Sequence, residues 1–227
     1  MPEWPKGHAW KACVGEIPPR VRISPSPPGI LFIELTRVPM NEEIHYCKEI
    51  SEKPSSFFFQ QGANRRGKKI LILGESLVKN GWVESGKAFY TSEGKLVPTG
   101  KRLNEELSLI GLTLEECAFT EIAKCYIGKN RKQLSNCGLA CAEHLVMQIR
   151  RSNPSIILSL GVITRDVLEN IFGTDLPMGE LREISNGAKT YRFLSLYHPS
   201  PANPFGHAKN IAILMSQRKF INKLLVA

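Results

Sequence analysis

From residue 69 onward, short apolar runs alternate with longer amphipathic stretches. The apolar runs occupy residues 69–73, 118–124, 156–160 and 192–196. Their short length and continuous hydrophobicity are typical of strands that are buried on both faces. The stretches with apolar side chains at helical spacing are residues 99–110, 135–151, 162–172 and 208–225. This order predicts an α/β fold, a three-layer sandwich in which helices cover both faces of a mainly parallel sheet.

Local signals set the ends of the expected helices. Gly111 ends the first helix, and the dipeptide Asn153-Pro154 ends the second. The residues of the second helix expected to face the core are Leu139, Leu145, Val146 and Ile149. The connection over residues 78–95 is long, and long loops in compact domains often carry function.

The N-terminal part of the chain lacks this alternation. Its expected elements are an irregular arm over residues 1–28, a strand over 30–35, a short helix over 41–51 with Asn41 as its N-cap, and a polar connector over 60–69. We therefore divide the chain into an N-terminal arm and partial cap, residues 1–65, packed on the same domain, and an α/β core, residues 66–227.

Composition and charge narrow the class of protein. A chain of 227 residues with 42% hydrophobic residues can bury one good core. Thirty Lys and Arg against 21 Asp and Glu give a net charge of +9, which favours a polyanionic partner, although a merely soluble basic protein would show the same excess. No apolar run reaches transmembrane length and the first residues lack a signal-peptide core, so we expect a cytoplasmic protein without a membrane partner.

Two of the apolar runs end in residues that can carry chemistry. The last run is followed by His198-Pro199-Ser200, and Pro201 further stiffens this turn. The first run leads into Gly74-Glu75-Ser76, a turn of small residues that carries a carboxylate. Because ligands of open α/β sheets bind at the carboxyl ends of the strands, both motifs are expected at one active-site edge.

These two motifs resemble those of the uracil-DNA glycosylase superfamily, in which one strand ends in Gly-Glu or Gly-Gln and a later one in His-Pro-Ser. The likeness is strongest to the iron–sulfur branch, often called family 4. The other segments that carry it are Gly86-Lys87-Ala88-Phe89, Lys124-Cys125, Gly128-Lys129-Asn130-Arg131 and residues 156–161. The resemblance runs from residue 69 to the C-terminus, and it implies base excision from DNA.

Cleavage of an N-glycosidic bond makes the sugar cationic and the departing base anionic. The resemblance implies that His198 donates a hydrogen bond to the base O2. It also implies that Glu75 positions a water and stabilises the cationic sugar, with Ser76 and nearby backbone donors as alternatives. The family continues this motif with Ala-Pro-Gly, whereas this chain has Ser76-Leu77-Val78. The competing readings are a surface histidine in a proline turn and a carboxylate that only caps a turn.

Two further residues are expected to bind the base. Phe89 corresponds to the family's aromatic on which the flipped base stacks, although it could be a core residue behind the loop. Glu121 stands where the family has the Asn that reads uracil. An ionised Glu only accepts, which suits the N4 amine of cytosine and not the O4 of uracil, whereas a protonated Glu could donate to cytosine N3. Alternatively, Glu121 points elsewhere and another side chain reads the base.

The six cysteines favour metal binding or core positions over disulfides in a cytosolic protein. The expected ligands of an iron–sulfur cluster or a zinc ion are Cys47, Cys125, Cys137 and Cys141, with Cys13 as a further candidate. Cys125 and Cys141 keep the spacing of the family's last two cluster ligands. The alternative is a set of buried free thiols, which is how we interpret Cys117. The chemistry itself requires no cofactor.

The basic residues and the loop after the His motif are candidates for DNA contact. Phe205 is an apolar side chain suited to fill the space that a flipped base leaves in the duplex. The expected DNA-binding residues are Ser200, Pro201, Phe205, Arg131, Lys132 and Lys209. A solvated basic face is the simpler explanation of the cations among them.

We therefore expect a monomeric, monofunctional DNA glycosylase that flips out a damaged or modified base and leaves an abasic site. Glu121 favours a cytosine derivative, either a damaged base in repair or a modified cytosine of phage DNA in antiviral defence. The alternatives are ordinary uracil excision in base-excision repair and a non-catalytic DNA-binding module that keeps the fold.

Overall fold

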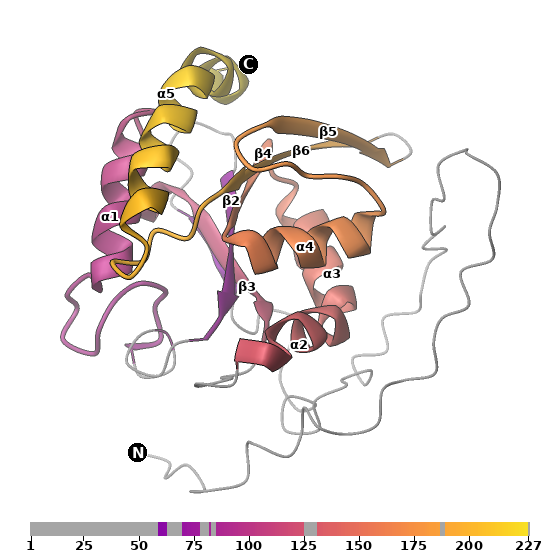
Figure 1. Ribbon diagram of the computed structural model, residues 1–227, viewed down its shortest axis with the longest axis horizontal. Helices are drawn as coiled ribbons and strands as arrows, with labels where there is room; N and C mark the ends of the chain where they lie inside the picture. The colour runs from indigo at the N-terminus through magenta and orange to yellow at the C-terminus, as the bar shows by residue number, and fades with distance from the viewer. Residues whose placement is uncertain are drawn as a thin grey trace, which may run out of the picture.

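A six-stranded sheet forms the centre of the protein, with its strands in the order β1-β3-β2-β4-β6-β5 (Figure 1). The computed structural model describes residues 59–62, 70–77, 82, 85–124, 131–186 and 189–226. The strands are β1 (Phe59–Gln60), β2 (Ile70–Ser76), β3 (Ala118–Ala123), β4 (Ile156–Leu160), β5 (Leu181–Asn186) and β6 (Lys189–Leu196). β3, β2, β4 and β6 run parallel, and β1 and β5 are antiparallel at the two edges. The predicted α/β fold with a mainly parallel sheet is confirmed.

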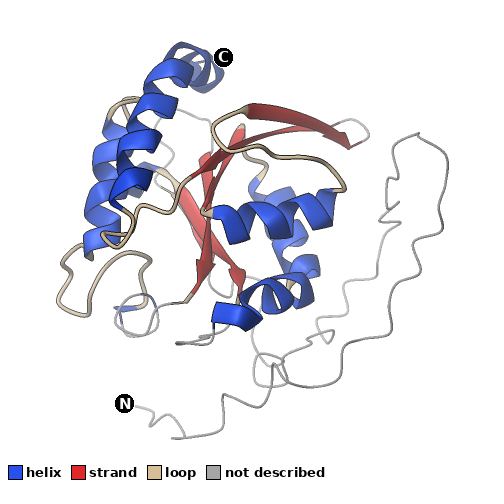
Figure 2. Ribbon diagram, in the orientation of Figure 1, coloured by secondary structure: helices blue, strands red, loops and turns tan. Residues whose placement is uncertain are grey.

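Helices cover both faces of the sheet, with α1 and α5 on one side and α2, α3 and α4 on the other (Figures 1 and 2). The helices are α1 (Pro98–Ser108), α2 (Leu134–Ala140), α3 (Ala142–Ser152), α4 (Val162–Phe172) and α5 (Pro204–Val226). Two short 3₁₀ turns, η3 (Leu114–Glu116) and η4 (Arg131–Gln133), lie in the connections. In the part of the chain that the structure describes, no helix is long and apolar enough to cross a membrane.

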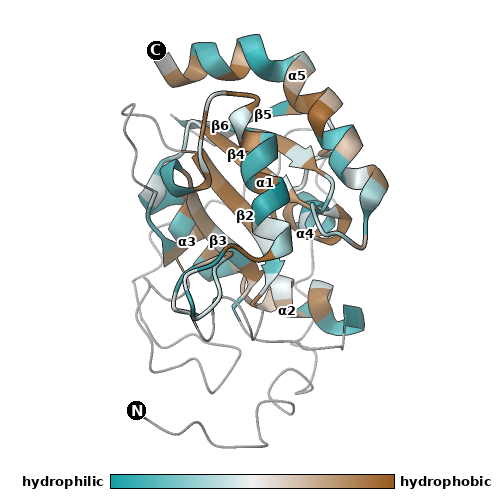
Figure 3. Cartoon of the chain, turned by 90° about the vertical axis from the view of Figure 1, so that its left-hand side faces the viewer, coloured by the Kyte–Doolittle hydropathy of each residue, from teal (hydrophilic) through white to brown (hydrophobic). Residues whose placement is uncertain are grey.

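Strand β2 shows why continuous apolar runs form the middle of this sheet. Ile70 and Ile72 pack into the core beneath α1 and α5, whereas Leu71 and Leu73 pack into the core beneath α3 and α4. All four are at most 2% exposed, since successive side chains of a strand point to opposite faces. Figure 3 shows the inner strands in the brown of hydrophobic residues.

The parallel register brings the carboxyl ends of four strands to one edge. Gly74 pairs with Glu121 across β2 and β3, and Leu160 pairs with Leu196 across β4 and β6. The residues that follow these pairs therefore emerge next to one another. This edge carries both motifs that the sequence singled out.

The end of β2 differs from the prediction. We expected the strand over residues 69–73 to stop before Gly74-Glu75-Ser76, but β2 continues to Ser76, which pairs with Ala123 of β3. Glu75 is therefore held on a strand and not in a turn. The strand continues because β3 offers a hydrogen-bonding partner at every step, which a single strand's sequence does not reveal.

The single helix predicted over residues 135–151 is wrong, because the chain breaks it at Cys141 into α2 and α3. Cys141 has φ −92° and ψ 6°, and its thiol accepts a hydrogen bond from the Lys124 N–H at 3.4 Å, which ties the junction to the end of β3. The break also turns α2, so that Leu139, expected to face the core, is 40% exposed. Leu145 and Ile149 of α3 are buried as predicted.

Strand β5 was not predicted, and α5 begins earlier than predicted. β5 pairs with β6 in a hairpin, and the Asn186-Gly187 dipeptide at the end of β5 is a strong hairpin signal in the sequence. Helix α5 begins at Pro204 and not at residue 208, because Asn203 accepts the Gly206 N–H through its side chain and Pro204 suits a first helical position. Phe205 therefore lies on the first turn of a helix.

The remaining elements are close to their predicted bounds, and β4 and α4 match them fully. The strand expected over residues 30–35 and the helix over 41–51 lie outside the described residues. Of the connector predicted over residues 60–69, Gln60 instead belongs to β1 (Phe59–Gln60), which pairs with β3.

Candidate active site

Glu75 and His198 both lie beside Gly161. A methyl group added to Gly161 would lie 2.8 Å from Glu75 Oε1 and 3.4 Å from His198 Cβ. Gly161 has φ 95° and ψ 157°, a conformation that is essentially restricted to glycine, and its N–H donates to the Leu196 carbonyl at 2.7 Å. It caps the N-terminus of α4, so the carboxylate also lies near the positive end of a helix. The sheet thus brings His198 and the Glu75 carboxylate together beside one small residue.

We expect Gly161→Ala to abolish excision and to destabilise the protein by about 1–3 kcal/mol, the usual cost of such backbone strain. The added methyl group would displace the Glu75 carboxylate. Gly173→Ala at the other end of α4 is the matched control, because Gly173 has φ 62° with nothing within 4 Å of the added carbon. Thermal unfolding and single-turnover excision would be measured for both; equal activity losses in the two variants would contradict the role given to Gly161.

The half-buried His198 is held as a neutral hydrogen-bond donor. Its Nδ1 accepts the Ser200 N–H at 3.2 Å, so the proton of the neutral ring is on Nε2. Burial lowers the pKa of His198 below its ordinary value of 6.5; the Glu75 carboxylate opposes this shift and the Arg131 guanidinium adds to it. The ring can therefore present an N–H to a ligand at neutral pH.

Glu75 is almost completely buried and forms an ion pair with Arg131. The Arg131 Nη2 lies 2.5 Å from Glu75 Oε2, while the guanidinium itself is largely exposed at the start of η4. The DNA phosphate contact expected of Arg131 stays a prediction, and the structure shows that this largely exposed side chain also pairs with Glu75. Arg131 can thereby hold one Glu75 oxygen while Oε1 faces Gly161.

Glu121 lies over Gly74, its partner on β2. A methyl group at Gly74 would lie 2.3 Å from Glu121 Oε2, so only glycine leaves room for this carboxyl group. Oε2 is buried and has no hydrogen-bond partner among the residues that the structure describes. Burial raises the pKa of Glu121 to about 8; Lys124 opposes this shift and Glu75 adds to it. At pH 7 Glu121 is therefore a neutral acid that can donate as well as accept.

Phe89 belongs to the same side of the sheet as Glu121. Its ring packs edge-on against Phe119 at 4.4 Å between centroids, and Phe119 in turn reaches Gly74. Phe89 is only partly buried and has φ 66°, an unusual backbone conformation for a bulky residue. Such strain is often found at ligand-binding positions, which agrees with a stacking role for this ring.

The other sequence candidates lie around this edge. Ser76 ends β2, and Ser200 accepts from the Ala202 N–H through its hydroxyl. Phe205 is 77% exposed on the first turn of α5, as a wedge residue would be. Lys209 lies 4.8 Å from the Tyr197 ring, and Lys132 and Pro201 are exposed.

The thiols expected to bind metal are described only in part. Cys137 and Cys141 are buried one turn apart, and Cys141 Sγ accepts the N–H of the residue before Cys125. Cys47 and Cys125 lie outside the described residues, and within those residues no three metal-ligating side chains cluster. Cys117 is buried in the core as predicted, where burial raises its pKa to about 12.

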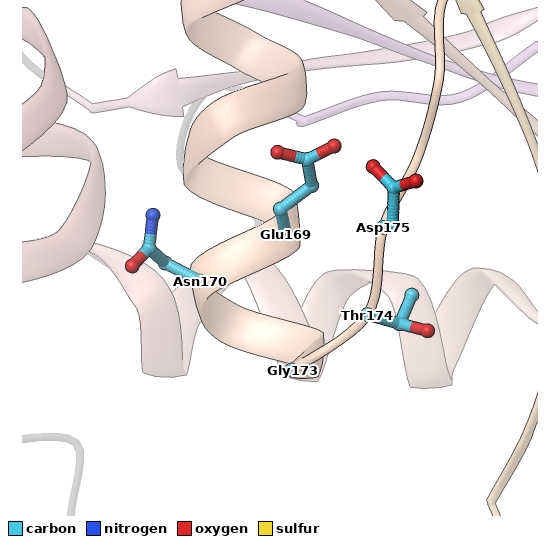
Figure 4. A pocket seen from close by; sticks show the side chains of 5 residues that line it. All are labelled: Glu169, Asn170, Gly173, Thr174 and Asp175. Atoms are coloured by element: carbon cyan, nitrogen blue, oxygen red, sulfur yellow. The ribbon is translucent and has the colours of Figure 1, made fainter.

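A shallow hollow elsewhere on the surface does not belong to this site. It is lined by Glu169, Asn170, Gly173, Thr174 and Asp175 at the C-terminal end of α4 (Figure 4). Glu169 accepts the Leu176 N–H there and so stabilises the turn. An eleven-residue helix, about 16 Å long, separates the hollow from Gly161.

Sequence reasoning overlooked several residues that build the site. Gly161 could have been found, because a glycine directly between a buried strand and a helix often marks a close approach. Glu106 and Asn210, described below, gave no signal, since single polar residues on amphipathic helices are expected at the surface.

The chain belongs to the uracil DNA glycosylase superfamily, whose family model matches residues 61–219. This confirms the resemblance drawn from the two strand-end motifs. The chain is similar to the type-4 uracil-DNA glycosylase of Archaeoglobus fulgidus, with 24% identity over 163 residues that make up 70% of this chain and 78% of that protein. It is also similar to the type-4 uracil-DNA glycosylase of Saccharolobus solfataricus, with 34% identity over 93 residues, 41% of this chain and 40% of that protein.

Proposed function

We propose that the protein is a DNA glycosylase that hydrolyses the N-glycosidic bond of a flipped-out base. The observation that carries this proposal is the placement of His198 and the Glu75 carboxylate beside Gly161. Membership of the superfamily and a net charge of +9 support DNA as the partner.

The site supplies a group for each charge that develops during bond cleavage. His198 Nε2–H donates to the base O2 as electrons move onto the base. Glu75, held by Arg131, positions the attacking water and stabilises the cationic sugar. Phe89 stacks on the extrahelical base and returns part of the cost of flipping. These roles require a base inserted between Phe89 and the strand ends.

A monofunctional reaction is proposed because no amine faces this site among the described residues. Lys124, which follows β3, is buried and donates to Thr120, Gln148 and the Glu121 carbonyl. Gln148 lies on α3, so this amine points toward the opposite side of the sheet from the Glu121 carboxyl group. Water is then the nucleophile, and the product is an abasic site.

Glu121 supports a cytosine derivative as the substrate. A neutral carboxyl group can donate its proton to cytosine N3 while its second oxygen accepts from the N4 amine. Proton donation to N3 also assists departure, because the ring nitrogen takes up the electron density released by the breaking bond. Ordinary cytosine must be spared, so a substituent on the base would have to be sensed, and the connection over residues 78–95 is our candidate. A modified cytosine of phage DNA or a damaged cytosine would suit this requirement.

Uracil is the second candidate, and two observations favour it. The relatives are named uracil-DNA glycosylases. In addition, a neutral Glu121 removes part of the objection raised from the sequence, because the acid can donate to uracil O4 and accept from N3–H. The neutral acid thus permits both bases, whereas the ionised form favours only an exocyclic amine.

A panel of duplexes that carry uracil, cytosine or 5-substituted cytosines tests the proposal. Cleavage of the product strand at abasic sites would report excision of each base under single-turnover conditions. We expect cleavage of at least one 5-substituted cytosine duplex and sparing of cytosine. Cleavage of the uracil duplex alone would establish the second candidate, and binding without cleavage of any duplex would leave a DNA-binding module.

We further propose that Cys137 and Cys141 share an iron–sulfur cluster or a zinc ion with Cys125 and Cys47. Anaerobically purified protein is then expected to carry iron or zinc at about one site per chain. Elemental analysis and the visible absorption of an iron–sulfur cluster would separate the two metals. Cys141→Ser should lower the metal content and Cys117→Ser should not, and metal-free native protein would contradict this assignment.

A further inference from the structure

We propose that Asn210, oriented by Glu106, is a positioning residue that fixes the backbone from which His198 projects. This inference rests on the proposed function, in which His198 polarises the base. Asn210 lies on α5 and Glu106 on α1, and both are completely buried at 0% exposure. Neither belongs to the motifs that the family resemblance brought forward.

The Asn210 amide binds both backbone groups of Tyr197, the residue just before His198. Its Oδ1 accepts the Tyr197 N–H at 2.8 Å, and its Nδ2 donates to the Tyr197 carbonyl at 2.8 Å. Strand β6 ends at Leu196, so the amide continues the hydrogen-bonding pattern of a neighbouring strand for one more residue. The chain therefore leaves the sheet in a defined direction at the step that leads to His198.

Glu106 fixes which way the Asn210 amide points. Its Oε2 accepts from Asn210 Nδ2 at 3.0 Å, and its Oε1 lies 2.8 Å from His207 Nδ1. An amide turned the other way would place its oxygen against the carboxyl oxygen and offer its NH₂ group to the Tyr197 N–H. Burial raises the pKa of Glu106, which the hydrogen bonds from His207 and Asn210 oppose. The buried acid thus has a partner for each oxygen.

Other side chains hold the carbonyl groups that follow. Arg102 of α1 donates to the Ser200 carbonyl at 3.1 Å, and Asn203 donates to the His198 carbonyl at 3.4 Å. Side chains of α1, α5 and the turn that precedes α5 thereby fix the backbone on both sides of the His198 imidazole. A shift of about 1 Å at a reacting group can lower the rate by up to about 100-fold. Loss of the Asn210 contact is therefore expected to lower the rate of excision.

The test compares Asn210→Ala with Asn104→Ala. Asn104 lies on α1, where its side chain accepts the Leu114 N–H at 2.9 Å and holds a different turn, so its loss serves as the matched control. We expect Asn210→Ala to slow single-turnover excision at saturating DNA by about 10- to 100-fold with unchanged DNA affinity. Glu106→Gln keeps an acceptor for Asn210 and should retain a rate close to wild type. Asn210→Gln, which displaces the amide by one methylene group, is the second variant in case Asn210→Ala does not fold.

A second readout separates this inference from the proposed function. The imidazole nitrogen resonances of His198, assigned by their loss in His198→Ala, should show an Nε2–H ring in the wild type and a changed environment in the folded Asn210 variants. If the protein excises no base at all, the His198 resonances alone still test whether Asn210 positions His198. Folded Asn210 variants with wild-type resonances, or with wild-type rates at saturating DNA, would overturn the proposal.

Discussion

His198→Ala is expected to bind DNA as the wild type does and to excise its base at least ~100-fold more slowly. The substitution removes the Nε2–H donor that would meet the base O2, in a position where burial keeps the ring neutral. Preorganised donors of this kind contribute mainly in the transition state, so the rate falls and the affinity does not.

The control for this variant is His144→Ala, which removes a histidine of α3 on the other side of the sheet. Rates would be measured under single-turnover conditions with the variant in excess over a labelled duplex, and affinity by titration of the same duplex. Wild-type turnover in His198→Ala would remove this residue from the mechanism.

The second large effect concerns the choice of base. Excision of a cytosine derivative is expected to fall as the pH rises through about 8, because Glu121 then loses the proton that it donates to N3. Glu121→Gln cannot transfer a proton, so it should lose this excision. Glu121→Asn restores the amide type found at the family's reader position and should gain activity towards uracil. Loss of a well-placed partner in a dry pocket costs about 1–3 kcal/mol, enough to reverse a preference between bases.

Glu121 also links folding to pH. Its pKa is raised from 4.5 to about 8 in the folded protein, so the native state holds this proton more tightly than the unfolded chain does. Its contribution to stability is therefore fully present below pH 4.5 and is lost as the pH rises towards 8. Glu121→Gln should unfold at a higher temperature than the wild type at pH 8 and at a similar one at pH 4. We claim that Glu121 is protonated at neutral pH. This claim would be contradicted if neither the base preference nor the rate changed with pH in both the wild type and Glu121→Gln.

The sheet and most helices could be predicted because their signals are local. The bounds predicted for residues 156–160 and 162–172 agree with β4 and α4 at both ends. An apolar run defines the strand and a glycine-capped amphipathic stretch defines the helix, and neither signal depends on residues far away in the chain. The break at Cys141 could not be, because it depends on a hydrogen bond to Lys124, seventeen positions earlier in the chain. The extension of β2 likewise depends on its partner β3.

The site was predictable to the extent that it lies at strand ends. Glu75 and His198 follow from the rule that parallel strands gather their carboxyl ends, and the structure places both beside Gly161. The protonation of Glu121 was left open by the sequence, because it depends on how deeply the carboxyl group lies and on the distance to Glu75. The contact of Arg131 with Glu75 was missed for the same reason, since residues far apart in the chain give no joint signal.

The most direct test of the central claim is to identify what the protein releases from DNA. Wild type and His198→Ala would be incubated with duplexes that carry uracil, cytosine and 5-substituted cytosines, and the small-molecule products analysed by mass spectrometry. The account predicts a free base, an intact strand with an abasic site and dependence of both on His198. Absence of any released base from wild type, on every duplex that it binds, would contradict the assignment of this edge of the sheet as a glycosylase active site.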